Sequence, residues 1–576
     1  MPTLDWIGKD KVINHHMDVP YRVLDKQYTY GGDKSENMII HGDNLEALKS
    51  LLPKYEGKVK CIYIDPPYNT GNEGWVYNDN VNDPKIKKWL GEVVGKEGED
   101  LSRHDKWLCM MYPRLKLLQK LLREDGAIFI SIDDNELYNL KMICDEIFGS
   151  NCFVSNVSWQ RTYSTRNDSK GIVNEIEHIL VYSKHPNWQP QKLARTAEMD
   201  ARYKNPDNDV APWKSSDAFA PGASTHQGMV YGVQHPFNGK MIYPTNGRCW
   251  AFGQDQVFDI MQEWGAYELK NINDEEKRAE ICGVTKTEIR KDVMAIMLTE
   301  PLEVASKRAM EVYVRGQWPI LCFSNEGKSG IRRKTYLDNV GGKLPTNYWP
   351  FVEVGHTDEA LKTLKAIFKG KNIFDTPKPS RLIERILHIV GVEDDMIVLD
   401  AFAGSGTTAH AVLNKNKEDG GHRRFILIEM GDYADTITAE RVKRVIDGYG
   451  EGKSAVEGTG GDFTYYELGQ PLFIEDHQLN PEVPDEKICE YIWYAETHTS
   501  YEPKDAPYYL GVANGTAYYF YYEKEALCIL NYAFLSHVQE KADHYVIYAD
   551  QCTLSDDELL KYGITFKKIP RDIARL

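Results

Sequence analysis

The stretch that decides the fold is Met396-Ile397-Val398-Leu399-Asp400-Ala401-Phe402-Ala403-Gly404-Ser405-Gly406-Thr407-Thr408. Its apolar run predicts a strand, Gly404 and Gly406 predict a turn, and the residues from 406 to 415 follow a helical pattern. A helix at about 379–390 precedes this unit, and a second strand, Phe425–Ile428, and a helix at about 434–447 follow it. The alternation predicts an α/β fold with a parallel sheet and a ligand loop at the end of a strand.

The glycines allow a ligand to approach the backbone and the first amides of the helix. The dinucleotide fingerprint needs three glycines at fixed offsets, whereas only Gly404 and Gly406 occur here, so pyrophosphate binding is not favoured. Glu429 closes the next strand, where ribose hydroxyls are normally bound. The loop therefore favours a nucleoside without phosphates, and a glycine turn that serves packing alone is the alternative.

The first part of the chain shows the same rhythm. A strand at 37–41 leads into a helix with leucines at 45, 48, 51 and 52, and a second strand, Val59–Ile64, follows. Further on we expect a helix at 105–123, the strand Ala127–Ile132 after an Asp125-Gly126 turn, a helix at about 134–148, and the strands Phe153–Trp159 and Ile176–Tyr182. The strand Val59–Ile64 stops at Asp65-Pro66-Pro67-Tyr68, because proline removes backbone donors and fixes φ.

The tetrapeptide Asp65-Pro66-Pro67-Tyr68 has the parts that methylation of an exocyclic amine requires. The lone pair of that nitrogen is delocalised into the base, and Asp65 and the Pro66 carbonyl can accept its two hydrogens and localise the lone pair for attack on a methyl group. Tyr68 offers a ring on which a flipped base can stack, and the two prolines stiffen the loop. The alternative is an ordinary turn.

Residues 186–370 lose the regular alternation and carry isolated aromatics such as Trp213, Trp250 and Trp264. We therefore expect four parts. Residues 1–185 and 371–450 are expected to be the two halves of one α/β domain, 186–370 an inserted domain, and 460–576 a C-terminal α+β domain. By resemblance to the amino-methyltransferases of DNA, 1–185 would be the catalytic half, 371–450 the cofactor-binding half and 186–370 the target-recognition domain. The expected fold class is a Rossmann-like sheet split by the insertion.

Together the two motifs resemble the amino-methyltransferases of DNA, in which Asp-Pro-Pro-Tyr and Phe-x-Gly-x-Gly mark the catalytic and cofactor loops. The order of catalytic loop, insertion and cofactor loop resembles the β group of that family. The resemblance implies S-adenosylmethionine as cofactor and adenine N6 in duplex DNA as target. It also implies a cofactor site made of Asp43, Lys378, Ser380, Asp400, Phe402, Gly404, Ser405, Gly406, Thr407 and Glu429.

Further segments look like the modification subunits of type III restriction–modification systems. They are Asn69-Thr70-Gly71-Asn72, Gly355-His356-Thr357-Asp358-Glu359-Ala360 and Tyr465-Tyr466-Glu467-Leu468. This resemblance implies a homodimer and a separate restriction subunit, since the chain has no Gly-x-x-x-x-Gly-Lys-Ser/Thr loop of its own. The segment Asn347-Tyr348-Trp349-Pro350-Phe351 differs from the family, which has an acidic residue after Trp-Pro. This difference concerns local recognition contacts and not the chemistry of methyl transfer.

The charge is unevenly distributed. Residues 451–576 hold 22 of the 86 acidic and 10 of the 69 basic side chains, so they account for −12 of the net −17. We therefore expect residues 460–576 to serve protein assembly, because acidic surfaces repel DNA phosphates. Lys328, Arg332, Arg333 and Lys334 form the densest basic cluster and are the candidate DNA-binding residues, with a solvated loop as the alternative.

Other classes are less favoured. No apolar run spans a bilayer and no secretory signal is recognised, so we expect a cytoplasmic protein without membrane segments. Ten scattered cysteines predict reduced thiols, and Glu175, Glu177 and His178 lack partners at metal-ligand spacing, so no metal is expected. His104-Asp105 fits a helix start better than a proton relay. N4-cytosine methylation and a mainly sequence-reading scaffold for a nuclease stay open. C5-cytosine methylation needs a cysteine nucleophile, which usually follows a proline, and no Pro-Cys pair occurs in the sequence.

Overall fold

The computed structural model describes residues 3–70, 88, 91–93, 102–164, 172–391, 393–474 and 478–574. The chain divides into two compact units, of which the first comprises Met1–Gln191 and Pro345–Leu576 and the second Lys192–Leu344. An insertion is therefore present, but the expected range 186–370 is too wide at both ends. Residues 345–370 contain a strand of the main sheet and the helix α12 (Thr357–Ile367), which belong to the first unit.

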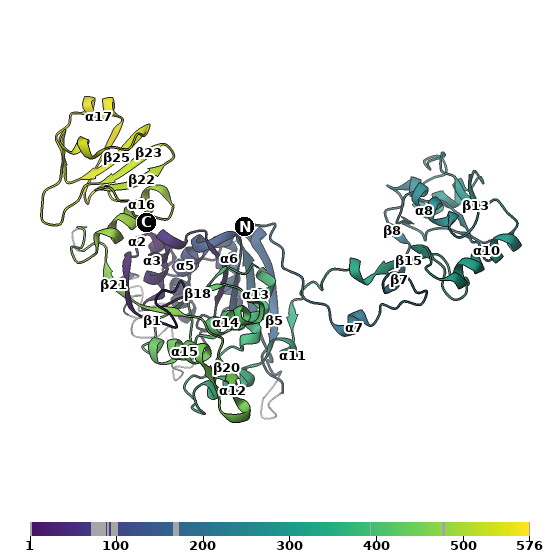
Figure 1. Cartoon of the computed structure of the whole chain (residues 1–576), viewed down its shortest axis with the longest axis horizontal. Helices are drawn as coiled ribbons and strands as arrows, with labels where there is room; N and C mark the ends of the chain where they lie inside the picture. The colour runs from purple at the N-terminus through teal and green to yellow at the C-terminus, as the bar shows by residue number, and fades with distance from the viewer. Residues whose placement is uncertain are drawn as a thin grey trace. The chain divides into compact units, whose positions relative to one another are not determined.

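The first unit is built on a ten-stranded sheet (Figure 1). Its strands are, in order across the sheet, β1 (Arg22–Tyr30), β21 (Phe463–Pro471), β2 (Met38–His41), β18 (Arg424–Glu429), β17 (Ile397–Asp400), β3 (Val59–Ile64), β4 (Leu122–Ile132), β6 (Ile176–Ser183), β5 (Phe153–Gln160) and β16 (Tyr348–Trp349). Strands β2, β18, β17, β3 and β4 are parallel, and β6 is antiparallel to β4. The expected split, Rossmann-like α/β sheet is confirmed, and the carboxyl ends of β17 and β3 lie side by side.

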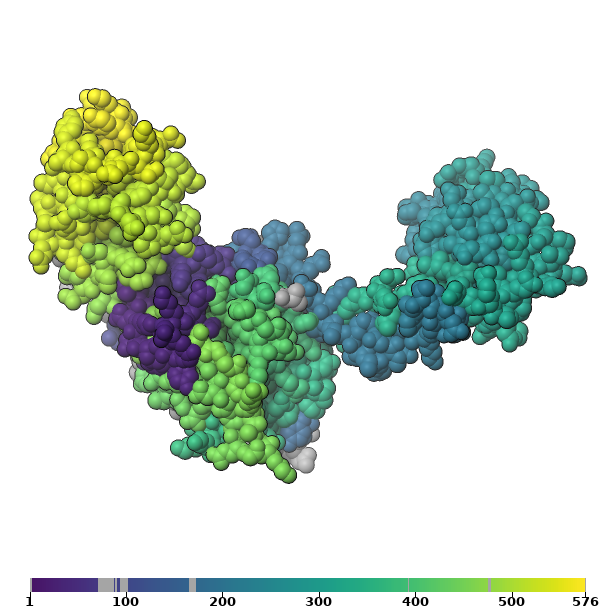
Figure 2. Space-filling view, viewed as in Figure 1, coloured from purple at the N-terminus to yellow at the C-terminus, as the bar shows by residue number. Residues whose placement is uncertain are grey.

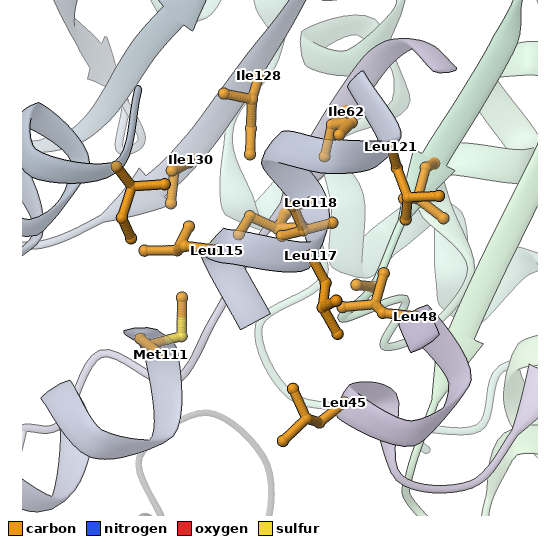
Figure 3. Close-up of a cluster of buried hydrophobic side chains, with 14 of the residues drawn as sticks. Leu45, Leu48, Ile62, Met111, Leu115, Leu117, Leu118, Leu121, Ile128 and Ile130 are labelled. Atoms are coloured by element: carbon orange, nitrogen blue, oxygen red, sulfur yellow. The ribbon is translucent and has the colours of Figure 1, made fainter. Parts of the chain in front are cut away.

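Helices cover this sheet and build its core. The longer ones are α3 (Asn44–Tyr55), α5 (Arg103–Leu121), α6 (Leu137–Phe148), α13 (Ser380–Val390), α14 (Thr407–Asp419) and α15 (Glu440–Asp447); α1 (Lys9–Val12), α2 (His15–Asp18) and α11 (Phe351–Val354) are single turns. Leucines of α3 and α5 pack against isoleucines of β3 and β4 (Figure 3). Each buried leucine contributes roughly 1.5–3 kcal/mol. Helix α5 begins with a capping box between Ser102 and Asp105, which confirms the helix-start interpretation of His104-Asp105.

Strand β21 corrects the expected boundary of the C-terminal domain. Phe463–Pro471 lies inside the main sheet, parallel to β2 and antiparallel to β1, so residues far apart in sequence lie side by side (Figure 2). The side chain of Leu468 lies against Gly42, where an added Cβ would be 2.4 Å from Leu468 Cδ1. The main sheet is therefore not complete at residue 450, and a C-terminal domain starting at 460 would cut it.

Beyond β21 the chain forms a smaller α+β part. Its main sheet contains β22 (Tyr509–Ala513), β23 (Thr516–Phe520), β25 (His544–Ala549) and β27 (Ile564–Lys568), with the helices α16 (Asp485–Thr497) and α17 (Asp556–Tyr562). Tyr519 and Phe520 are buried in cores within the first unit, whereas Tyr518, Tyr521 and Tyr522 are partly exposed. Two of these five aromatic side chains thus fill the interior of this part.

The second unit contains short sheets packed around a larger and a smaller hydrophobic core. Its elements are α7 (Ala197–Asp200), β7 (Trp213–Asp217), β8 (Phe219–Pro221), β9 (Val233–Gln234), β10 (Met241–Ile242), β11 (Arg248–Trp250), α8 (Gln254–Gln262), β12 (Tyr267–Lys270), α9 (Glu275–Cys282), β13 (Ala295–Leu298), α10 (Leu302–Arg315), β14 (Leu321–Cys322) and β15 (Arg332–Tyr336). Trp213, Trp250 and Trp264, which looked isolated in the sequence, share the larger core. The lack of a regular period therefore reflects short strands and not a missing core.

All ten cysteines are free and eight of them are buried, which confirms the expected thiols. Within the described ranges, no helix combines the length and the apolar character that a membrane crossing requires.

Candidate active site

The two loops predicted from the sequence, the catalytic loop at Asp65 and the cofactor loop at 400–408, meet in one pocket at the carboxyl ends of β3 and β17. Among the residues predicted from the sequence, Asp65, Lys378, Asp400, Phe402, Gly404, Ser405 and Thr407 line it. The pocket is also lined by Tyr63, Phe374, Thr376, Pro377, Ala403 and Thr408. Two motifs that are more than 300 residues apart are thus brought together because their strands are neighbours.

The cofactor loop has the backbone shape that its glycines allow. Gly404 and Gly406 have φ angles of 54° and 81°, which favour glycine, and a Cβ at Gly406 would lie 3.1 Å from the Thr438 carbonyl oxygen. The Asp400 carboxylate fixes the loop by accepting hydrogen bonds from the Phe402 amide at 3.0 Å and the Thr408 hydroxyl at 2.5 Å. Burial raises the pKa of Asp400 to about 7.

Glu429 ends β18 and lies behind the same loop. Its carboxylate accepts hydrogen bonds from the amides of Gly404 and Gly431 and from the Tyr433 hydroxyl, each at 2.8 Å. Burial raises the pKa of Glu429 to about 7. The carboxylate is therefore held against the loop by three donors, at the strand end where the sequence predicted a ribose contact.

Asp43 and Ser380 lie at helix starts. Asp43 caps α3 by accepting a hydrogen bond from the Leu45 amide at 2.7 Å, and Ser380 is the first residue of α13. They are not among the residues that line the pocket. Their contact with a cofactor stays a prediction from the resemblance.

A buried arginine that the sequence analysis did not identify supports the loop. Arg441 Nη1 donates to Ser405 Oγ at 2.8 Å and to Thr407 Oγ1 at 2.7 Å. Because these hydroxyls accept from Arg441, their own protons can point elsewhere, and both residues line the pocket.

The catalytic loop is anchored by its neighbours. Lys378 Nζ donates to Asp65 Oδ2 at 2.6 Å, and the Tyr68 hydroxyl donates to Asp65 Oδ1 at 2.9 Å. The Trp107 indole donates to the Pro67 carbonyl at 2.7 Å, which fixes the backbone of the loop. Burial raises the pKa of Asp65, and the charge of Lys378 opposes this without cancelling it.

Two further side chains complete this cluster, and sequence reasoning missed their role. Glu177 on β6 was considered only as a metal ligand, yet its Oε2 accepts from the Tyr68 hydroxyl at 3.1 Å and lies 3.7 Å from Lys378 Nζ. Arg161 Nη1 donates to Glu177 Oε1 at 2.8 Å. Two carboxylates and two cations therefore lie together at the catalytic loop.

The residue after the tetrapeptide is also fixed. Asn69 is fully buried with a φ of 58°, and its amide donates to Glu136, which His104 Nδ1 contacts at 2.7 Å. Gly71 and Asn72 lie outside the described residues. His104 thus supports the exit of the catalytic loop through Glu136.

The predicted basic cluster lies in the second unit, at and before β15. Lys328 is exposed and contacts Glu326 at 3.2 Å, Arg332 Nε donates to Ser215 Oγ at 3.1 Å, and Arg333 lies over the Phe252 ring. These three side chains reach the surface at least in part.

The prediction that Lys334 binds DNA is wrong. Its side chain is fully buried, and its Nζ contacts Asp207 Oδ2 at 2.5 Å and also Asp209. Burial raises the pKa of Asp209, but hydrogen bonds from Lys334 and Tyr336 outweigh it and lower that pKa below its ordinary value. A lysine held in this way has a structural role.

We predict that Lys334→Met destabilises the second unit by about 3–5 kcal/mol, because removing one partner leaves buried carboxylates uncompensated. Urea unfolding with hydrogen exchange over residues 192–344 measures this. Lys328→Met, which removes an exposed charge, is the matched control and should leave stability unchanged. Equal stability of the two variants would contradict the structural role.

Comparison with known proteins agrees with this geometry. Residues 59–440, which contain both loops and the whole insertion, match the family described as DNA methylase. The chain belongs to the DNA methylase family. This methylase is 32% identical to the type III restriction-modification enzyme StyLTI Mod subunit of Salmonella typhimurium, over 77% of this chain and 62% of that protein.

Two other relatives extend the comparison. The methylase is 30% identical to the EcoP15I Mod subunit of Escherichia coli, over 75% of this chain and 64% of that protein. It is 26% identical to the type II methyltransferase M.KpnI of Klebsiella pneumoniae, over 69% and 81% of the two chains. The methylase thus spans less than two thirds of the length of these two Mod subunits.

Proposed function

We propose that this methylase transfers a methyl group from S-adenosylmethionine to N6 of a flipped adenine in duplex DNA. The observation that carries the proposal is the single pocket lined by Asp65 of the catalytic loop and by Asp400, Phe402 and Gly404 of the cofactor loop. An amine bound at Asp65 would therefore be next to a cofactor bound at the glycine loop.

The residues of the pocket fit S-adenosylmethionine. Gly404 lines the pocket with a left-handed backbone and no side chain, Phe374 and Phe402 offer apolar faces, and Asp400 adds a carboxyl group. The cofactor supplies a methyl group activated by its sulfonium. Glu429 would bind the ribose hydroxyls, and the resemblance adds Asp43 and Ser380 as further contacts.

The catalytic loop would act on the base. Asp65 and the Pro66 carbonyl accept the hydrogens of the amine, and the Tyr68 ring carries the flipped base. Lys378 Nζ lies 5.1 Å from the centre of that ring, and only 7% of Tyr68 is exposed, so a base that stacks on the ring has to uncover its other face. We favour adenine over N4 of cytosine, because N4-cytosine methyltransferases more often have Ser at the position that Asp65 occupies here.

We propose that the second unit reads the DNA sequence and that Lys328, Arg332 and Arg333 contact phosphates. Replacing all three with glutamine should weaken binding for every sequence and flatten the log–log salt dependence by about 0.9 per lost contact. Fluorescence anisotropy at several salt concentrations measures this. Lys277, Lys286 and Lys291, which are exposed on the same unit, form the control triple; an equal effect of both triples would count against the cluster.

We also propose that the protein is a cytoplasmic type III modification subunit, which forms a homodimer and assembles with a restriction subunit. The likeness to two type III Mod subunits supports this assignment. Light scattering tests whether the chain is a dimer. Co-purification from the source cells tests whether a restriction subunit binds to it. A monomer that retains no such subunit would favour a stand-alone methyltransferase.

Long-read sequencing of DNA from cells that express the chain tests the proposed function, because it reports the modified base and its context together. We expect N6-methyladenine within one recurring sequence. Modified cytosines at a recurring sequence would favour the N4 alternative, and unmodified DNA that the chain nevertheless binds would favour the scaffold.

A further inference from the structure

Asp65 and Glu177 share the same two donors. The Tyr68 hydroxyl lies 2.9 Å from Asp65 Oδ1 and 3.1 Å from Glu177 Oε2, and Lys378 Nζ lies 2.6 Å from Asp65 Oδ2 and 3.7 Å from Glu177 Oε2. A hydroxyl has one proton to donate, so Tyr68 can serve only one of the two carboxylates well at a time. The cluster therefore has two hydrogen-bonding arrangements.

The arrangement matters because Asp65 has to accept a hydrogen bond from the target amine. While Tyr68 and Lys378 both donate to Asp65, the amine competes with them for the same carboxylate oxygens. A carboxylate that already pairs with a lysine at 2.6 Å is also a weaker hydrogen-bond acceptor for the amine hydrogens. An alternative acceptor within reach of both donors relieves this competition.

Glu177 lies where it can be this alternative acceptor. It lies on β6, separate from the catalytic loop, and only 5% of its surface is exposed. Arg161 Nη1 donates to its other oxygen at 2.8 Å, so the buried carboxylate has a cationic partner while Oε2 receives other donors. Glu177 is not among the residues that line the cofactor pocket.

We propose that Glu177 is a positioning residue for methyl transfer, which accepts the hydrogen bond of the Tyr68 hydroxyl and a closer contact from Lys378 when the target amine reaches Asp65. This inference rests on the proposed function. It adds a second carboxylate to the Asp-Pro-Pro-Tyr loop, from a strand about 110 residues further along the chain.

The charged groups around Asp65 give the inference a pH signature. Asp65 faces Lys378, Tyr68 and Tyr63, and the carboxylates of Glu177 and Asp400 also act on the cluster. Burial raises the pKa of Asp65, and the negative charge of Glu177 raises it further. Removing that charge should lower the pKa of Asp65, so the acid limb of the activity profile should move to lower pH.

The test compares Glu177→Gln with Glu175→Gln, which removes the same charge two residues earlier on the chain. Both variants are assayed on DNA that carries the recurring sequence identified by long-read sequencing. Calorimetry measures their binding of S-adenosylmethionine. We expect Glu177→Gln to lower kcat by on the order of 10-fold to 100-fold, with an acid limb shifted to lower pH and unchanged cofactor affinity. Glu175→Gln should behave as the unaltered chain does.

Glu177→Asp is the second variant, since it keeps the charge and shortens the reach. It should lower kcat without moving the acid limb, and circular dichroism confirms that each variant is folded. An acid limb that is the same for Glu177→Gln and Glu175→Gln would overturn the inference, as would misfolding of both Glu177 variants, which would assign Glu177 to stability. Absence of methyl transfer by the unaltered chain would instead contradict the proposed function.

Discussion

Asp65→Asn is expected to lower methyl transfer by roughly 100-fold or more while cofactor binding is retained, because the amide keeps the shape of the side chain and loses the charged acceptor. In the structure Asp65 pairs with Lys378, which also lines the cofactor pocket. The asparagine carbonyl can still accept from Lys378, and Glu177 holds that lysine from its other side. The loss should therefore appear in kcat and not in the affinity for S-adenosylmethionine.

Single-turnover methylation and calorimetry measure these two quantities. Asp134→Asn is the matched control, because Asp134 lies two residues after the end of β4 at the same edge of the sheet and its side chain is exposed. Retained turnover of Asp65→Asn near that of Asp134→Asn would show that the carboxylate is not the acceptor of the amine.

The second large effect is expected from removing β21. A chain that ends at Asp462 should lose the cooperative fold of the first unit, because β21 lies between β1 and β2 and buries Phe463, Thr464 and Tyr465. Each large apolar side chain contributes roughly 1.5–3 kcal/mol. Together with the lost strand pairing, this approaches the total stability of about 5–15 kcal/mol that is typical of a domain.

A chain that ends at Ile474 keeps β21 and removes the part that follows it, so it is the control. It should still bind S-adenosylmethionine, with reduced stability because Tyr494 of α16 packs into the main core. Circular dichroism, thermal unfolding and calorimetry distinguish the two chains. Cofactor binding and a sharp unfolding transition in the chain that ends at Asp462 would show that β21 is dispensable.

The pocket residues that could be predicted are those with a local sequence signal. Asp65 and the loop from Asp400 to Thr407 each follow an apolar strand, and the rules of parallel sheets bring the ends of neighbouring strands together. The fold class followed from the same alternation, because strands and helices of regular length recur in both parts of the first unit.

Other features depend on partners that are far away in the sequence. His41 and Glu467 pair across 426 residues, so Tyr465-Tyr466-Glu467-Leu468 could be noticed as a motif but not placed in the main sheet. Glu177 carries no local signal for its contact with Tyr68. Lys334 looked like part of a basic surface because its neighbours are basic, whereas its acidic partners Asp207 and Asp209 lie about 125 residues earlier.

The central claim is that this methylase modifies the exocyclic amine of adenine. The most direct measurement incubates the purified chain with DNA and S-adenosylmethionine that carries a deuterated methyl group, digests the DNA to nucleosides and identifies the labelled product by mass spectrometry. The account predicts labelled N6-methyldeoxyadenosine from the unaltered chain and a strongly reduced amount from Asp65→Asn. Labelled N4-methyldeoxycytidine, or label that is independent of Asp65, would contradict it.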